Sequence, residues 1–197
     1  MSNRKIIRVI NILKKSEYIT SKQVTAKGIE RNVLKTLVDM GELYRVSRGV
    51  YARSDTWEDE LYLLQNKYKK GIYSHDTALY LLGYSDRTPA KYIMTFPQGY
   101  NSPSLKQECV VVKRALMDYY SFGIIELSSP CGNTIHLYNL ERTLCDILRG
   151  RGSDIQIIIP AMRRYISSQA KDINKLMQYA EQLHVRSKVL RYLEVLL

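Results

Sequence analysis

The sequence predicts an α+β protein built from two parts, and three observations lead to this prediction. Apolar residues recur at the spacing of short helices through residues 3–40, and two β-prone runs follow them. Between residues 92 and 138, strand-like runs alternate with Pro, Gly, Ser and Asn. From Asp154 onward the apolar residues return to helical spacing. We therefore expect a small helical domain closed by a hairpin, followed by a mixed α/β domain that ends in a helical tail.

The predicted domain boundary lies where the composition changes abruptly to polar and acidic residues, at 53–60. We expect the N-terminal domain to take residues 1–53 and the C-terminal domain to take residues 54–197. Within the second domain, the strand-containing part is expected over 54–148 and the helical tail over 149–197.

The first two helices of the N-terminal domain follow from apolar spacing and capping residues. Apolar residues recur at helical spacing from Ile6 to Leu13, which predicts the first helix. Thr20 and Gln23 form the Thr-x-x-Gln pattern of a capping box, so a second helix is expected to begin there. That helix is expected to end before Gly28, since glycine readily adopts the positive φ of a tight turn.

A third helix and a hairpin complete the predicted N-terminal domain. The helix is expected over 30–40, and Gly41 is well placed to terminate it. The runs Leu43–Val46 and Val50–Ala52 flank a short turn that contains Gly49, which is typical of a hairpin. Three short helices followed by a hairpin is the layout of a winged helix-turn-helix.

In the C-terminal domain, predicted helices combine with short strands. Ser74 is expected to cap a helix over 75–82, and Asn139 to cap another that ends near Leu148. Pro160 lies inside an apolar run, so the tail helix is expected either to be kinked at this residue or to begin there. The expected strands are Tyr92–Phe96, Cys109–Lys113, Gly123–Leu127 and Thr134–Tyr138.

The net charge of +11 is unevenly distributed. Residues 1–53 carry twelve Lys and Arg against four Asp and Glu, a balance of +8. The balance is −2 over residues 54–148 and +5 over residues 149–197. This distribution indicates a polyanionic partner contacted mainly through the N-terminal domain. A lipid surface is the rival polyanion, but the sequence shows neither a lipidation motif nor an amphipathic helix with exposed bulky apolar residues.

Double-stranded DNA is the polyanion that a winged helix-turn-helix binds. The second helix of the motif enters the major groove, so its polar side chains face the bases. Arg bonds bidentately to guanine and Asn to adenine, which makes Arg31 and Asn32 the best candidates for base contacts. The residues expected to contact bases or phosphates are Ser21, Lys22, Lys27, Arg31, Asn32, Lys35, Thr36, Arg45 and Arg48.

The aromatic residues, the cysteines and the N-terminus bear on other classes of protein. The chain has 16 Tyr, 2 Phe and 1 Trp, which suggests stacking on single strands, yet most tyrosines fall where a half-buried ring is the ordinary explanation. Cys109, Cys131 and Cys145 are odd in number and widely spaced, which favours reduced thiols over a disulfide framework. No apolar run is long enough for a membrane span or a signal peptide, so we expect a cytoplasmic protein with no membrane partner.

The sequence does not indicate an enzyme. It contains no P-loop, no Gly-x-Gly-x-x-Gly and no Gly-x-Ser-x-Gly motif, and its three His residues lack the spacing of a metal site. His75 and Asp76 fall in the first turn of a predicted helix, where Asp complements the helix dipole. Cys145 falls on a predicted buried helix face, so a core residue is expected rather than a nucleophile. We therefore expect no catalytic residue, no metal and no cofactor.

Three blocks of the sequence resemble the AbiEi antitoxins of bacterial abortive-infection systems. The blocks are Arg48-Gly49-Val50-Tyr51-Ala52 at the end of the wing, Ser74-His75-Asp76-Thr77-Ala78-Leu79 with Ser85-Asp86-Arg87-Thr88-Pro89, and Tyr138-Asn139-Leu140-Glu141-Arg142-Thr143-Leu144-Cys145-Asp146-Ile147. They occur in the order of the family and span most of residues 5–150. The polar residues in the second and third blocks that we single out are His75, Asp86, Arg87, Glu141, Arg142 and Asp146. Arg87 and Glu141 could as easily pair with each other as contact a partner.

The resemblance implies a two-gene toxin–antitoxin pair that protects bacteria against phage. The antitoxin of such a pair represses its own promoter through the winged helix, and we expect it to read repeated operator half-sites. It also counteracts a nucleotidyltransferase-like toxin, AbiEii, through its C-terminal domain, and the family is usually placed among antitoxins that form no stable complex with the toxin. The alternatives are a transcription regulator whose second domain senses a ligand or a partner, and a nucleic-acid-modifying enzyme delivered by the winged helix.

Overall fold

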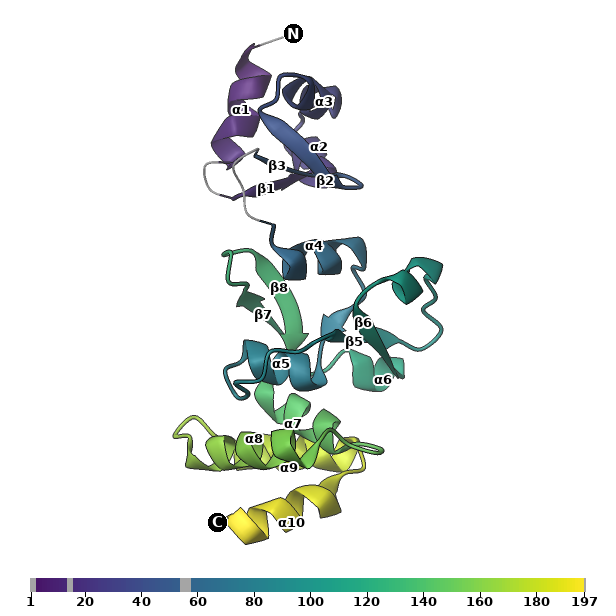
Figure 1. Cartoon of the computed structure of the whole chain (residues 1–197), viewed down its shortest axis with the longest axis vertical. Helices are drawn as coiled ribbons and strands as arrows, with labels where there is room; N and C mark the ends of the chain where they lie inside the picture. The colour runs from purple at the N-terminus through teal and green to yellow at the C-terminus, as the bar shows by residue number, and fades with distance from the viewer. Residues whose placement is uncertain (1–2, 14–15, 54–57, 197) are drawn as a thin grey trace. The chain divides into compact units, whose positions relative to one another are not determined.

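A computed structural model describes residues 3–13, 16–53 and 58–196 (Figure 1). The chain forms two compact units. Unit 1 consists of residues 1–69 together with 128–135, and unit 2 consists of residues 70–127 and 136–197. The predicted boundary between residues 53 and 54 borders residues 54–57, which lie outside the described residues.

Unit 1 has the predicted succession of helices and hairpin (Figure 1). Its elements are α1 (Asn3–Leu13), β1 (Tyr18–Thr20), α2 (Ser21–Ala26), α3 (Asn32–Asp39), β2 (Leu43–Ser47), β3 (Val50–Arg53) and α4 (Glu60–Lys67). The three strands form an antiparallel sheet in the order β1-β3-β2. Tyr18–Thr20 forms a strand because β3 offers it an edge to pair with. The winged helix-turn-helix fold is confirmed for this unit.

Apolar residues at helical spacing build the core of unit 1. Val9, Val24, Leu34 and Leu37 are fully buried and pack into one cluster that joins α1, α2 and α3. The capping box at the start of α2 is confirmed, because the Thr20 side chain accepts from the Gln23 backbone and the Gln23 side chain accepts from the Thr20 backbone. Local sequence thus places the helix start, and burial of the apolar face fixes the helix against its neighbours.

A buried polar cluster connects residues of unit 1 that are far apart in the sequence. Asp59 caps α4 by accepting from the Tyr62 amide at 3.0 Å, and its amide donates to the Tyr18 hydroxyl at 2.7 Å. Its carboxylate also accepts from the Ser129 hydroxyl and, at 2.8 Å, from the Asn133 side-chain amide. A buried carboxylate needs such partners to offset the loss of hydration. Residues 128–135 therefore belong to unit 1, which the sequence did not reveal.

Unit 2 combines a sheet with helices. Its elements are β4 (Ile72–Tyr73), α5 (His75–Leu81), β5 (Tyr92–Pro97), a 3₁₀ helix η1 (Pro103–Gln107), β6 (Val110–Ala115), α6 (Met117–Tyr120), β7 (Ile124–Ser128), β8 (Thr134–Tyr138), α7 (Leu140–Leu148), α8 (Ile155–Ser167), α9 (Ile173–Gln182) and α10 (Arg186–Leu196). The strand order is β6-β5-β4-β8-β7, in which β5 pairs parallel with β6 and β4 pairs parallel with β8. The α+β class with a helical tail is confirmed.

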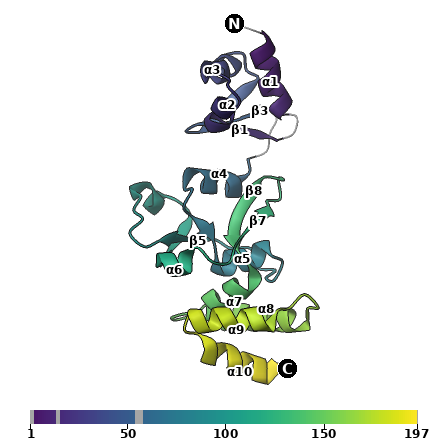
Figure 2. The same ribbon diagram turned by 180° about the vertical axis from the view of Figure 1, so that it is seen from behind.

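The helices of the tail pack around α7. Leu144, Met162, Leu176 and Val189 come from α7, α8, α9 and α10 and are fully buried in one cluster. In both views α8 and α9 lie next to α7, and α10 lies on the far side of α8 and α9 (Figure 1 and Figure 2). Helix α8 begins at Ile155 and contains Pro160, so of the two expected alternatives the start of a helix at this proline is excluded. No described helix is long and apolar enough to cross a membrane.

The two predicted helix caps of unit 2 differ in outcome. Asn139 caps α7, since its side chain accepts from the Arg142 amide at 3.0 Å. Ser74 occupies the N-cap position of α5, but its hydroxyl makes no cap hydrogen bond. It accepts instead from the Thr95 hydroxyl at 2.8 Å, across the neighbouring strand. Thr95 and the helix backbone compete for the Ser74 hydroxyl, and local sequence cannot show that Thr95 lies within reach.

Buried tyrosines behave as the sequence analysis expects of core residues with a polar end. The Tyr138 hydroxyl donates to the Tyr120 carbonyl at 2.8 Å, and the Tyr165 hydroxyl donates to the Asp172 carbonyl at 2.7 Å. Burial raises the pKa of both hydroxyls. These rings are therefore packed in the protein interior and cannot stack on nucleic-acid bases.

Candidate nucleic-acid interface

A hollow of about 440 Å³ in unit 1 gathers basic side chains from the helix-turn-helix, the wing hairpin and the end of α4. We call it the basic hollow. Its cationic residues are Lys22, Arg31, Arg45, Arg48 and Lys69, and it is also lined by Thr20, Ser21, Gly49, Val50, Tyr51 and Asn66. No Asp or Glu is among the described residues that line it. A group of five cations without a carboxylate in the lining attracts a polyanion.

The wing turn is held against the start of α2. The Ser21 amide donates to the Gly49 carbonyl at 2.8 Å. Gly49 has a φ of +79°, and a Cβ added there would lie 3.5 Å from the Ser21 Oγ. This docking fixes Arg48, next to Gly49, close to Lys22, next to Ser21. The basic hollow therefore depends on backbone geometry as well as on charge.

The Gly49 turn yields a first prediction, with a modest effect. Gly49→Ala is expected to destabilise the chain by about 1 kcal/mol, because a non-glycine residue at positive φ is strained. Urea unfolding of the variant checks this value. Gly99→Ala is the matched control, since Gly99 has a φ of +82° in unit 2 and open space where the added methyl group would lie. Equal stability loss is expected for both, but only Gly49→Ala is expected to weaken DNA binding.

Arg31 stands at the N-cap of α3 and is exposed. Its Nε donates to the Thr25 hydroxyl of α2 at 3.2 Å. This bond leaves the terminal nitrogens of the guanidinium for other partners, and these atoms can contact the edge of a guanine. The structure thus places Arg31 in the basic hollow with its outer donors available.

Asn32 is the first residue of α3 and is exposed, as predicted, but its side chain already has a partner. Its side-chain amide donates to the Glu30 carboxylate at 3.2 Å, and Lys5 pairs with the same carboxylate. The hydrogen bond from Lys5 lowers the pKa of Glu30, so this carboxylate is ionised at neutral pH. A contact between Asn32 and adenine therefore requires that the bond to Glu30 be exchanged.

The remaining predicted DNA contacts divide into two groups. Ser21, Lys22, Arg45 and Arg48 line the basic hollow together with Arg31. Lys27, Lys35 and Thr36 do not line it, and the Thr36 hydroxyl is bonded to the Asn32 carbonyl at 3.2 Å. Lys27 and Lys35 are exposed. Their contact with DNA stays a prediction.

Two residues at the end of α4 belong to the basic hollow although the sequence analysis assigned them to the second domain. Lys69 contributes a cation, and Asn66 contributes an amide. Within the described part of the chain, the Asn66 Nδ2 is buried and has no hydrogen-bond partner. A buried donor without a partner is costly. The signal in the sequence was the Lys67, Lys69, Lys70 cluster after the acidic stretch.

The comparisons with known proteins bear on the same segment. Residues 8–54 match the sequence model of the family described as transcriptional regulator, AbiEi antitoxin. The resemblance of this segment to AbiEi antitoxins is confirmed. The crystal structure of the RV2827C protein from Mycobacterium tuberculosis is similar in fold, with a TM-score of 0.60 at 15% identity over 98% of this chain and 78% of that chain. No curated protein matches the chain.

The AbiEi-like blocks of unit 2 contain mostly buried residues. Arg142 is fully buried, and its Nε donates to Asp146 at 3.0 Å. Its guanidinium also lies 4.5 Å from the ring centroids of both Phe122 and Tyr138. These contacts hold α7 against neighbouring elements, since a buried charge requires a partner.

The other residues of these blocks have partners different from those considered in the sequence. Glu141 is buried, and its carboxylate lies 3.5 Å from the Lys175 ammonium. The suggested pairing of Arg87 with Glu141 was therefore wrong, because α9 supplies the cation. Asp86 is exposed and lies 3.4 Å from Arg164. Cys145 lies in the core, where burial raises the pKa of its thiol to about 12.

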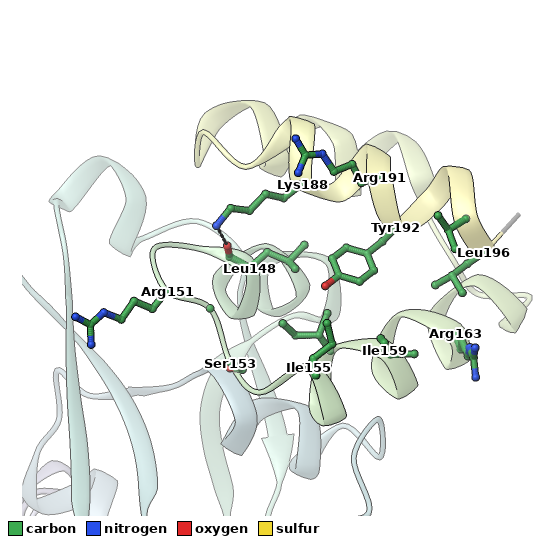
Figure 3. A pocket seen from close by; sticks show the side chains of 13 residues that line it. Leu148, Arg151, Ser153, Ile155, Ile159, Arg163, Lys188, Arg191, Tyr192 and Leu196 are labelled. Carbon is green, nitrogen blue, oxygen red and sulfur yellow. Dashed lines mark hydrogen bonds between the residues drawn. The ribbon is translucent and has the colours of Figure 1, made fainter.

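The tail of unit 2 carries a second hollow, of about 560 Å³, between α8 and α10 (Figure 3). Ile155, Tyr192 and Leu196 give it apolar walls. The Lys188 ammonium donates to the Leu148 carbonyl at 2.8 Å, and this bond joins α10 to the end of α7 (Figure 3). Arg151, Arg163 and Arg191 also line this hollow, so part of the excess positive charge of residues 149–197 gathers here.

Proposed function

We propose that this chain is a cytoplasmic operator-binding autorepressor and the antitoxin of an abortive-infection toxin–antitoxin pair. The observation that supports the proposal most directly is the basic hollow, most of whose lining lies in the segment that matches the AbiEi antitoxin regulators. Lys22, Arg45 and Arg48 are positioned to contact DNA phosphates, and Arg31 a base edge. Phosphate contacts set the position of the protein on DNA, and base contacts set its sequence preference.

The proposed second activity is relief of a nucleotidyltransferase-like toxin, and it is assigned to unit 2. Its support is the AbiEi resemblance of the blocks around His75 and Arg142, because the family counteracts its toxin through the C-terminal domain. The chain acts in this proposal as a binding protein and not as an enzyme. Repeated operator half-sites spaced by about 10 base pairs or a multiple would allow paired binding of a module with one winged helix.

A prediction separates the two activities by point substitutions. The double variant Arg45→Gln/Arg48→Gln is expected to derepress a reporter fused to the native promoter, because it removes two phosphate-binding charges from the basic hollow. The same variant is expected to rescue growth when it is co-expressed with a cognate toxin from a foreign promoter. Reporter activity and colony counts measure the two outcomes.

A control of equal charge change is available in unit 2. Lys91→Gln/Lys106→Gln removes two exposed cations that line none of the hollows described above, and it is expected to keep repression. Loss of rescue by the folded Arg45/Arg48 variant would show that both activities share one surface. Repression that persists in this variant would remove the basic hollow from the proposal.

Arg31 provides a finer test of base readout. Arg31→Ala is expected to weaken binding to the operator by about 1–3 kcal/mol and to leave binding to random duplex nearly unchanged, since a base contact discriminates between sequences. Fluorescence anisotropy with the two duplexes at one salt concentration measures both affinities. Equal losses on both duplexes would assign Arg31 to the phosphates instead.

A further inference from the structure

A small hollow in unit 2 gathers charged side chains to which the proposed function assigns no ligand. It has a volume of about 200 Å³. We call it the His75 hollow, and its polar side chains are His75, Thr95, Lys113, Arg114, Arg142, Asp146 and Arg149. These residues come from the start of α5, from β5 and β6, and from α7 and its end.

The register of the sheet and the packing of α7 create this hollow. Thr95 of β5 and Lys113 of β6 are partners in the parallel pair, so their side chains project from the same face of the sheet. Arg142 and Asp146 lie one helical turn apart on α7 and are fully or almost fully buried. Arg149 follows directly at the end of α7. Elements distant in the sequence thus converge on one point.

The charges of the His75 hollow do not balance. Asp146 is the one carboxylate among the described residues that line it, and Arg142 already neutralises Asp146 through the 3.0 Å ion pair. Lys113 and Arg149 therefore have no carboxylate partner among the described lining residues, whereas Arg114 donates to the Tyr100 carbonyl at 3.5 Å and projects from the other face of the sheet. Two such cations beside a small space create a field that favours an anion.

Arg142 has N–H donors that could bind such an anion. Within the described chain, Arg142 uses Nε for Asp146 and one terminal nitrogen for the Tyr119 carbonyl. A guanidinium carries five N–H donors, so this buried side chain has further N–H donors that these two bonds do not use. The Phe122 and Tyr138 rings pack against the guanidinium and hold it rigid, which lowers the entropy lost on binding.

His75 is in a conformation that costs energy. Its φ is +51°, in the left-handed region that non-glycine residues rarely adopt. Strain of this kind persists mainly at functional sites. The His75 Nδ1 lies 3.0 Å from the Ser74 hydroxyl, which orients the ring. Burial lowers the pKa of His75, so the imidazole is neutral at pH 7 and contributes a dipole rather than a charge.

From this geometry we infer that the His75 hollow binds a phosphate group, either free phosphate or the phosphoryl end of a small phosphorylated metabolite. The donors Lys113, Arg142 and Arg149 come from β6, from α7 and from the residue that follows α7, and Arg residues match the oxygens of a phosphate bidentately. The volume lies below the about 300–1,000 Å³ of sites that enclose a whole small molecule, so the remainder of a larger ligand would extend outside. The site would make unit 2 responsive to a ligand. This inference is independent of operator binding.

Calorimetric titration of the full chain tests the site at constant ionic strength. Inorganic phosphate and adenosine monophosphate are the probes, and sodium chloride is the blank. One-to-one saturable binding of phosphate is expected. Lys113→Gln and Arg149→Gln are each expected to weaken it about tenfold, since each removes a charge-assisted hydrogen bond. Both residues are exposed, so the variants should fold. Arg149→Lys should retain most of the affinity, and Lys106→Gln, an exposed cation outside the hollow, should retain all of it.

The outcomes separate the possible ligands. Tighter binding of adenosine monophosphate than of phosphate assigns the site to a phosphorylated metabolite, and equal or weaker binding assigns it to free phosphate. Absence of saturable binding up to about 10 mM of both probes overturns the inference. It is also overturned if random duplex DNA displaces phosphate and Lys113→Gln weakens duplex binding, because the cations then contact a nucleic-acid backbone. Arg45→Gln/Arg48→Gln should bind phosphate normally, which distinguishes failure here from failure of the DNA-binding proposal.

Discussion

Replacing Lys22, Arg45 and Arg48 together with Gln is expected to lower the affinity for operator DNA about 100-fold at physiological salt. The reason is counterion release, because each lysine or arginine that neutralises a phosphate adds about 0.9 to the dependence of log K on log salt. Five cations line the basic hollow, so the unchanged protein should show a slope of about −4.5. The triple variant keeps two of these cations and should show a slope of about −2. Fluorescence anisotropy over a series of KCl concentrations measures both quantities.

The control for this variant removes the same charge from unit 2. Lys91, Lys106 and Arg163 are exposed and lie outside the basic hollow, and their replacement by Gln should leave the slope within about 0.5 of its original value. If the two triple variants lose affinity equally, net charge and not the hollow governs binding. A slope shallower than about −2 for the unchanged protein would remove the electrostatic argument itself.

Arg142→Met is expected to destabilise unit 2 by about 3–5 kcal/mol. The substitution leaves Asp146 buried without its cation, and the loss of one partner of a buried ion pair has this magnitude. It also removes the guanidinium that packs against the Phe122 and Tyr138 rings. Hydrogen exchange of the α7 amides reports the local free energy of opening in this unit. Arg163→Met, an exposed change of the same kind, should alter the exchange by less than about 0.5 kcal/mol.

A second substitution shows whether the pair or the packing is responsible. Arg142→Met combined with Asp146→Leu removes both charges and is expected to be more stable than Arg142→Met alone, since no unpaired carboxylate remains. Arg142→Lys keeps a charge but not the planar group against the rings, so an intermediate loss is expected. Equal stability of the single and double variants would mean that packing alone accounts for the effect.

Local sequence signals predicted the helices and the hairpin well because their causes are local. The capping box of Thr20 and Gln23, the cap at Asn139 and the glycine turn at Gly49 all act within a few residues. They were therefore visible without knowledge of the fold. The buried residues of α3, Val33, Leu34 and Leu37, lie on one face, as helical periodicity places them.

The same local signals misplaced residues whose environment is set by distant segments. Ser74 has the sequence of a helix cap, yet Thr95 on the neighbouring strand takes its hydroxyl. Glu141 pairs with Lys175, which is supplied by a helix later in the chain. Such pairings depend on strand register and helix packing, which arise from burial of the whole core.

The sequence by itself determined the winged helix, the concentration of positive charge in residues 1–53, and the basic side chains that a polyanion would meet. Only the tertiary structure decided that Asn66 and Lys69 complete the basic hollow, that Ser129 and Asn133 join unit 1 through Asp59, and that His75 meets Arg142 and Asp146. The physical reason is the distance along the chain between the residues that interact. Caps, turns and helical periodicity are fixed by neighbours along the chain, whereas a hollow is formed by residues that only the folded core brings together.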